Sequence, residues 1–180
     1  MGDLRSRYFY LAVACEKDGK LLMMRRKRRY HPTGHRGQWM TSIGYKTSGH
    51  APSFDAMRQF ERQTGLKPLK LRYYGTIQLR VGPQTYDYVA LFQVLKFEGE
   101  LRADNYYGTF EWIPKERVLG PKRRLLWLPD RVLLKAMEEK RRLLLMLRYL
   151  MNPDGTVGVV SDVLCNHNLR MTPEELEEWR

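Results

Sequence analysis

The chain has 180 residues, 43% of them hydrophobic and 12% aromatic, and carries a formal net charge of +12. This composition and length are typical of one folded domain with a hydrophobic core, and they exclude an intrinsically disordered chain. No run of about 18 apolar residues is present, so we expect no membrane-spanning segment. The strong positive charge favours polyanionic partners, namely nucleotides, nucleic acid or acidic membrane surfaces.

The two cysteines and the N-terminal segment bear on the cellular compartment. Cys15 and Cys165 form no CxxC pair, and the first twenty residues lack the apolar core of a secretory signal. We therefore expect a reducing, cytoplasmic environment. Gly2 and Ser6 match the myristoylation pattern, but that pattern fixes few positions and an ordinary frayed terminus is the alternative.

The N-terminal part of the chain predicts three strands. Aromatic and β-branched residues indicate a strand at Tyr8–Lys17, and the Asp18-Gly19 turn joins it to a second strand at 20–27. Proline and glycine predict a loop at 29–37, followed by a short strand at 38–45.

A helix and three further strands are predicted in the middle of the chain. Pro52 is suited to start the helix and Gly65 to end it. Two long strands at 69–81 and 86–97 follow, and a shorter strand at 109–114 ends at a proline.

The C-terminal part predicts a helix at 128–140, with Pro129 and Asp130 in its first turn. Residues 141–151 are compatible with a longer helix, but the following Asn-Pro-Asp-Gly turn favours a β-hairpin with 156–163. These elements predict a mixed α+β domain over residues 1–165. Residues 166–180 are expected to form a C-terminal tail with a short capped helix.

The helix after Pro52 has two contrasting sides. At 100° per residue, Ala56, Met57 and Phe60 point to one side, which we expect to face the core. The opposite side is expected to carry polar residues beside the preceding loop. These polar residues are Asp55, Gln59 and Arg62, with Gln63 at the margin.

The segment from Gly44 to Leu66 resembles the Nudix box, a glycine, a glutamate and an Arg-Glu-x-x-Glu-Glu helix at fixed spacing. Gly44, Arg58, Phe60, Gly65 and Leu66 match in register. The four glutamate places of the box are occupied by His50, Gln59, Arg62 and Gln63.

The resemblance extends beyond the box. The segments at 69–80, 86–101, 108–119, 126–135 and 141–163 follow the order seen in MutT-type oxidised-purine nucleoside triphosphatases. It implies a Nudix fold with a mixed β-sheet, and hydrolysis of a nucleoside triphosphate with Mg²⁺ held on the helical glutamates.

The box residues of this chain argue against that metal chemistry. Magnesium prefers hard, anionic oxygen ligands, whereas Gln59 and Gln63 offer neutral carbonyl oxygens and Arg62 brings a positive charge. We therefore expect no metal cofactor. A divergent hydrolase with Mg²⁺ on Asp55 and Asp104 stays open, with Asp55 as an ordinary first-turn acid the alternative.

The same residues favour direct phosphate binding. Arg62 and the basic run that starts at Arg25 are candidate phosphate contacts. The resemblance implies that Trp127 and Asp130 contact a purine, and that Met40 stands where some relatives have an asparagine. A nucleoside phosphate is thus the expected ligand, with hydrolysis absent or weak. A core aromatic and a helix cap are the structural alternatives for Trp127 and Asp130.

Two further groups of residues suggest other kinds of site. His31, His35 and His50 suggest zinc, but the Pro-Thr-Gly segment between the first two argues against a helix that would present both. Tyr106, Tyr107 and Trp112 near basic residues suggest RNA stacking, although such residues often pack a sheet. RNA or another protein remains an alternative partner.

Overall fold

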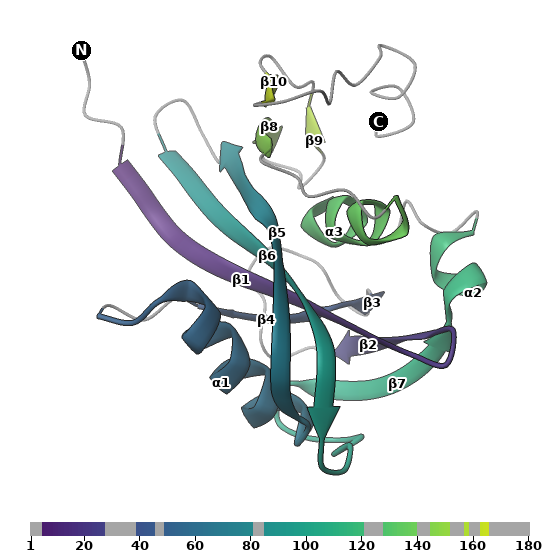
Figure 1. Cartoon of the computed structure of the whole chain (residues 1–180). Coiled ribbons are helices and arrows are strands. Elements are labelled where there is room, and N and C mark those ends of the chain that lie inside the picture. The colour runs from purple at the N-terminus through teal and green to yellow at the C-terminus, as the bar shows by residue number, and fades with distance from the viewer. Residues whose placement is uncertain are drawn as a thin grey trace.

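A mixed β-sheet with helices on both faces forms the centre of the molecule in this computed structural model (Figure 1). The structure describes residues 5–27, 39–45, 49–80, 85–120, 128–139, 145–151, 157–158 and 163–165. The predicted α+β class is confirmed. The predicted 29–37 loop and the 166–180 tail with its helix lie outside the described residues.

The described strands and helices follow the predicted order. The strands are β1 (Arg5–Lys17), β2 (Lys20–Arg26), β3 (Trp39–Met40), β4 (Ser42–Tyr45), β5 (Lys67–Arg80), β6 (Thr85–Glu98), β7 (Gly108–Pro114), β8 (Leu145–Met151), β9 (Val157–Gly158) and β10 (Val163–Cys165). The helices are α1 (Pro52–Thr64), α2 (Lys115–Leu119) and α3 (Leu128–Glu138).

The sheet combines parallel and antiparallel pairs. Its strand order is β10-β8-β5-β6-β1-β2-β3, with β4 on β1, β7 on β2 and β9 on β8. The pairs β1–β6 and β5–β8 are parallel, and β5–β6 and β1–β2 are antiparallel. The hairpin predicted near the C-terminus is confirmed, since Leu150 pairs with Gly158 and Met151 with Val157.

Two details of the predicted elements were wrong. The single strand expected at 38–45 is divided at Thr41 into β3, which pairs with β2, and β4, which pairs with β1. The strand that ends at Pro114 leads directly into α2, for which Pro114 is the N-cap residue. A five-residue helix contains too few turns to produce a clear apolar period, which explains why it was not predicted.

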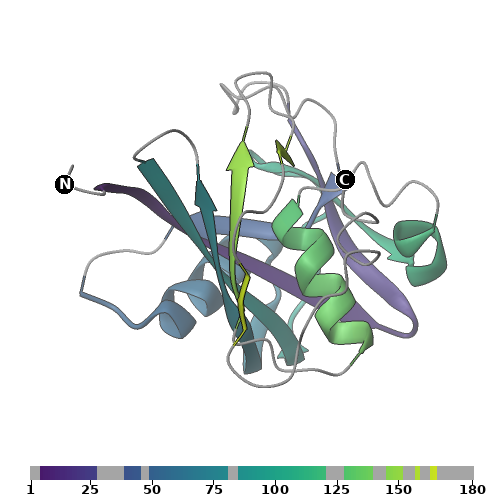
Figure 2. The same ribbon diagram turned by 90° about the horizontal axis from the view of Figure 1, so that it is seen from above.

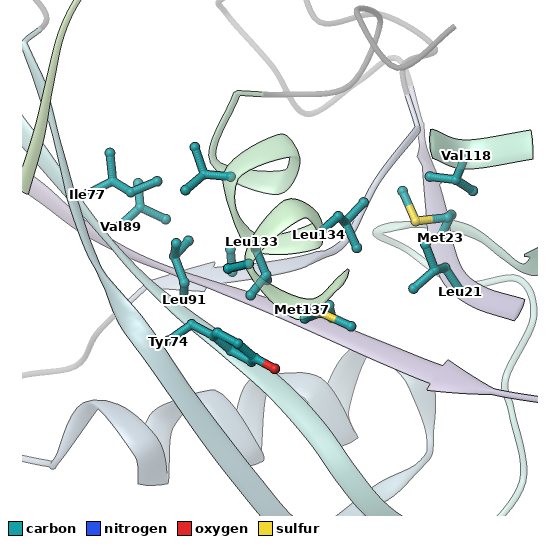
Figure 3. Close-up of a cluster of buried hydrophobic side chains, with 14 of the residues drawn as sticks. Leu21, Met23, Tyr74, Ile77, Val89, Leu91, Val118, Leu133, Leu134 and Met137 are labelled. Atoms are coloured by element: carbon teal, nitrogen blue, oxygen red, sulfur yellow. The ribbon is translucent and has the colours of Figure 1, made fainter. Parts of the chain in front are cut away.

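Hydrophobic side chains fill both faces of the sheet because successive strand residues point to opposite sides. In β1, Ala12 and Ala14 face α3, whereas Leu11, Val13 and Cys15 face α1. The hydrophobic cluster on the α3 side of the sheet includes Tyr74, Leu91 and Leu133 (Figure 3). Figures 1 and 2 place α1 and α3 on opposite sides of the sheet, so each helix covers its own cluster.

Candidate functional site

Helix α1 begins and ends where the sequence predicts. Pro52 occupies its first turn, and Gly65 adopts the left-handed conformation with φ of 80° at the C-cap. The Gly65 N–H donates to the Glu61 carbonyl oxygen at 2.8 Å. Glycine permits this ending because a side chain destabilises the left-handed region.

The polar side predicted for α1 was partly wrong. Asp55 is 0% exposed and Gln63 is 3% exposed, so both lie inside the protein, whereas Arg62 is exposed and Met57 is only half-buried. Ala56 and Phe60 are buried as expected. The helix contacts β1, β4 and β5 together, and this broad support covers the margins of its polar side as well as its apolar centre.

The amide side chains at two box positions already accept hydrogen bonds from protein groups. Gln63 Oε1 accepts from Ser42 Oγ at 2.6 Å, which ties α1 to β4. Gln59 Oε1 accepts from Arg62 Nη2 at 2.7 Å on the exposed side of the helix. Of the remaining box positions, Gly44 lies in β4 opposite Leu11, and Arg58 is exposed.

The two acids considered for catalysis lie toward different ends of α1. Asp55 Oδ1 in the first turn is 3.4 Å from His50 Nδ1, and the His50 ring packs on Phe54. Asp104 precedes Asn105, whose side chain bonds to the carbonyl oxygen of Gln63. Asp55 and Gln63 are eight residues apart, or about 12 Å along the helix axis.

Asp104 is itself engaged by neighbouring groups. Lys27 Nζ lies 3.0 Å from Asp104 Oδ2, and Thr109 Oγ1 donates to Asp104 Oδ1 at 3.0 Å. The hydrogen bond from Lys27 is the main reason that the pKa of Asp104 is below its usual value, with Thr109 contributing next. Both carboxylate oxygens of Asp104 thus have protein partners, and neither of these partners is His50, which Asp55 contacts.

The loop that follows β6 donates hydrogen bonds to the last carbonyl oxygens of α1. Arg102 Nη2 donates to the carbonyl oxygens of Glu61 and Arg62 at 3.1 Å each, and Asn105 Nδ2 donates to that of Gln63 at 2.5 Å. The last carbonyls of any helix lack partners within it. That general requirement is the only sequence signal that points to Arg102 and Asn105, and it does not identify which loop supplies the donors.

Aromatic rings adjoin this end of α1. The Arg62 guanidinium lies 5.5 Å from the centre of the Tyr107 ring, within the range of a cation–π contact. Tyr106 meets Tyr107 edge-on, with 5.6 Å between ring centres, and is 62% exposed. Trp112 instead stacks on Phe97 against the core.

The residues expected to contact a base are buried or outside the described chain. Met40 is 4% exposed, and Asp130 is 0% exposed. Asp130 accepts from Thr41 N at 3.2 Å and from Thr41 Oγ1. Burial raises the pKa of Asp130 to about 7, although the two Thr41 hydrogen bonds oppose the shift. Arg25 in β2 is exposed, and Trp127 lies outside the described residues.

A metal centre and a membrane-spanning helix are two further kinds of site, and each concerns the part of the chain that the structure describes. Within it, no group of three or more His, Cys, Asp or Glu side chains is arranged to hold a metal ion. His31 and His35, considered for zinc, lie outside it. Within the same residues, no helix has the length and apolar character needed to cross a membrane.

Comparison with solved structures relates this architecture to known proteins, although no family model matches the chain. A MutT protein from Bacillus halodurans superposes with a TM-score of 0.72 and 18% identity over 87% of this chain and 97% of that one. A MutT Nudix hydrolase from Burkholderia pseudomallei superposes with a TM-score of 0.60 and 17% sequence identity, over 73% of this chain and 97% of that one. The Nudix domain of Shewanella oneidensis NrtR, complexed with ADP-ribose, superposes with a TM-score of 0.59 and 14% sequence identity. The match covers 76% of this chain and 89% of that one. The chain therefore has the fold of the MutT/Nudix hydrolases.

Proposed function

We propose that this chain binds a nucleoside phosphate at the exposed C-terminal part of α1 and does not hydrolyse it by magnesium chemistry. One observation carries the proposal: the three helical glutamate positions of the box hold Gln59, Arg62 and Gln63. The Arg62 side chain is exposed, and both glutamine side-chain oxygens accept hydrogen bonds from other protein groups.

These residues do not fit a magnesium ion. Magnesium requires close oxygen ligands in octahedral geometry and is usually bound through one or two carboxylates. The Gln63 oxygen is buried against Ser42, and the Gln59 oxygen accepts from the Arg62 guanidinium. An ion beside Gln59 would meet the positive charge of Arg62 at close range. We therefore expect no metal cofactor at this site.

The same arrangement suits a phosphate group. A guanidinium forms short, charge-assisted hydrogen bonds to phosphate oxygens, and Arg62 is exposed in the last turn of α1. The net charge of +12 raises the local concentration of such anions. The relative complexed with ADP-ribose supports a nucleoside diphosphate derivative as one ligand to test. We expect this binding to occur in the cytoplasm.

The alternative hydrolase receives less support from the geometry. Asp55, in the first turn of α1, contacts His50, whereas Asp104 contacts Lys27 and is next to Asn105, which bonds to the last turn of the helix. A single ion held by both carboxylates would require each within about 2.1 Å of the metal. Magnesium carried by the substrate is the remaining route to hydrolysis.

Calorimetric titration with ATP, GTP and ADP-ribose tests the proposal, first in EDTA and then in Mg²⁺, with phosphate release measured in parallel. We expect binding in EDTA, little change of Kd with Mg²⁺, and no phosphate release. The variant Gln59→Glu/Arg62→Glu serves as the comparison, because two exposed carboxylates should make Mg²⁺ raise its melting temperature.

Two results would overturn the proposal. Absence of binding by every nucleotide, with and without Mg²⁺, would remove the nucleotide ligand. Magnesium-dependent phosphate release by the parent protein would instead support the divergent hydrolase, and an Asp104→Asn variant would then test whether that acid takes part.

A further inference from the structure

We propose that Tyr106 stacks on the base of the nucleotide whose phosphate Arg62 holds, so that the ligand is a single nucleotide bound across the C-terminal end of α1. This inference rests on the proposed function, and it places the base on a different surface from Met40 and Asp130. Those two side chains are buried, and Asp130 is bonded to Thr41, so neither offers an exposed polar group to a base.

The chain on both sides of the exposed Tyr106 is held in place by hydrogen bonds of Asn105 and Tyr107. The Asn105 side chain donates to the Gln63 carbonyl oxygen at 2.5 Å and accepts from Tyr107 N at 2.9 Å. Asn105 N also donates to the Gly108 carbonyl oxygen at 3.1 Å. A tyrosine on an anchored backbone has only two side-chain torsions to restrict on binding, which favours its use as a ligand contact.

Arg62 is positioned by the same cluster. Its guanidinium contacts the Tyr107 ring at 5.5 Å and donates to Gln59 Oε1 at 2.7 Å, which leaves further N–H groups on an exposed side chain. Tyr107 is thus a common neighbour of Arg62 and Tyr106, at 5.5 and 5.6 Å. A nucleoside di- or triphosphate is long enough to reach from the exposed ring to the guanidinium.

The exposure of Tyr106, Tyr107 and Trp112 bears on the choice between a single nucleotide and RNA. A single-stranded nucleic acid is bound by several aromatic rings that stack successive bases. Tyr107 is half-buried and covered by Arg62, and Trp112 stacks on Phe97. Of Tyr106, Tyr107 and Trp112 only Tyr106 is exposed, so these three residues offer one ring to a base and not a run of rings.

The experiment separates the base from the phosphates. We would titrate the full chain in EDTA with ATP and with inorganic tripolyphosphate, which presents the phosphates without a base. The parent should bind ATP about tenfold more tightly than tripolyphosphate, as one aromatic stacking contact provides. Tyr106→Ala should abolish this preference and leave tripolyphosphate affinity unchanged, and Tyr106→Phe, which keeps the ring, should retain it.

The outcomes distinguish this inference from the proposed function. A parent that prefers ATP and a Tyr106→Ala variant with the same preference would overturn the Tyr106 assignment and leave the proposed function intact. No binding of either ligand would overturn both. An oligonucleotide of eight residues that binds far more tightly than ATP would overturn the single-nucleotide ligand in favour of RNA, whereas equal affinity would support it.

Discussion

At the scale of single residues, Asp130 connects helix α3 to the start of β4 at an electrostatic cost. Its carboxyl group is fully buried and accepts from both the backbone and the hydroxyl of Thr41. Loss of hydration outweighs these bonds and raises the pKa to about 7 from the ordinary value of 3.8. The folded protein therefore binds a proton that the unfolded chain releases between these two values.

This linkage predicts how stability depends on pH. Because the folded state binds more protons, the Asp130 contribution is present below about pH 4 and is lost as the pH rises to about 7. The full loss is on the order of 4 kcal/mol, since each pKa unit corresponds to about 1.4 kcal/mol. Urea unfolding of the parent and of Asp130→Asn between pH 4.5 and 8 measures most of this loss. The parent should lose stability relative to the variant across this range, and a constant difference would contradict the assigned pKa.

At the scale of elements, the junction between α1 and the loop after β6 depends on the absence of a side chain at Gly65. Its φ is 80°, and a Cβ there would lie 2.7 Å from the Glu100 carbonyl oxygen and 2.9 Å from the Arg102 side chain. Two separate costs therefore oppose an alanine: the left-handed backbone and the close approach of another backbone segment.

A pair of variants separates these two costs. Gly19 also has a positive φ, of 72°, but a Cβ there would meet nothing within 4 Å. Gly19→Ala should lower the free energy of unfolding by about 1–2 kcal/mol, the cost of the backbone conformation alone. Gly65→Ala should lower it by a further amount of about 1–3 kcal/mol, because the Arg102 loop must move. Urea denaturation at one pH gives both values, and equal losses would show that the loop does not press on Gly65.

Local signals predicted α1 well at its ends and poorly on its sides. Pro52 and Gly65 mark the boundaries because their backbone preferences act within a few residues. Periodicity states which residues share a side but not how much of the circumference other elements cover. Asp55 and Gln63 are buried because β4 and β5 pack beside the helix, a consequence of contacts between distant parts of the chain. The same reasoning explains Thr41, whose partner Asp130 lies 89 residues away.

The candidate site shows the same division. The residue types at the box positions were readable from spacing, including the cation at Arg62 and the absence of carboxylates. The attachment of the Arg102–Tyr107 loop to α1 was not, because no short pattern encodes a hydrogen bond across some forty residues. That attachment is what puts Tyr107 against Arg62 and Tyr106 beside it.

For the molecule as a whole, two effects of positive charge on nucleotide binding can be separated: a direct contact by one arginine, and the attraction by the total charge. Arg62 in α1 and Arg117 in α2 are both exposed. The two helices pack against hydrophobic clusters on opposite faces of the sheet (Figure 1). Replacing either by glutamine removes one positive charge from the net +12. At 0.1 M salt, exposed charges further apart than about 10 Å interact weakly.

We therefore predict unequal effects of these two substitutions on nucleotide binding. Arg62→Gln should weaken ATP binding in EDTA at least about tenfold and reduce the slope of log K against log salt, because it removes a direct phosphate contact. Arg117→Gln should leave the slope unchanged and alter Kd by less than about twofold, since its charge acts only through solvent. Titrations between 50 mM and 500 mM NaCl measure the Kd and the salt slope of both variants. The screening length falls as salt is added across this range, so the influence of a remote charge falls with it. Equal losses in the two variants would mean that the diffuse positive field attracts the nucleotide and that no contact at Arg62 holds it.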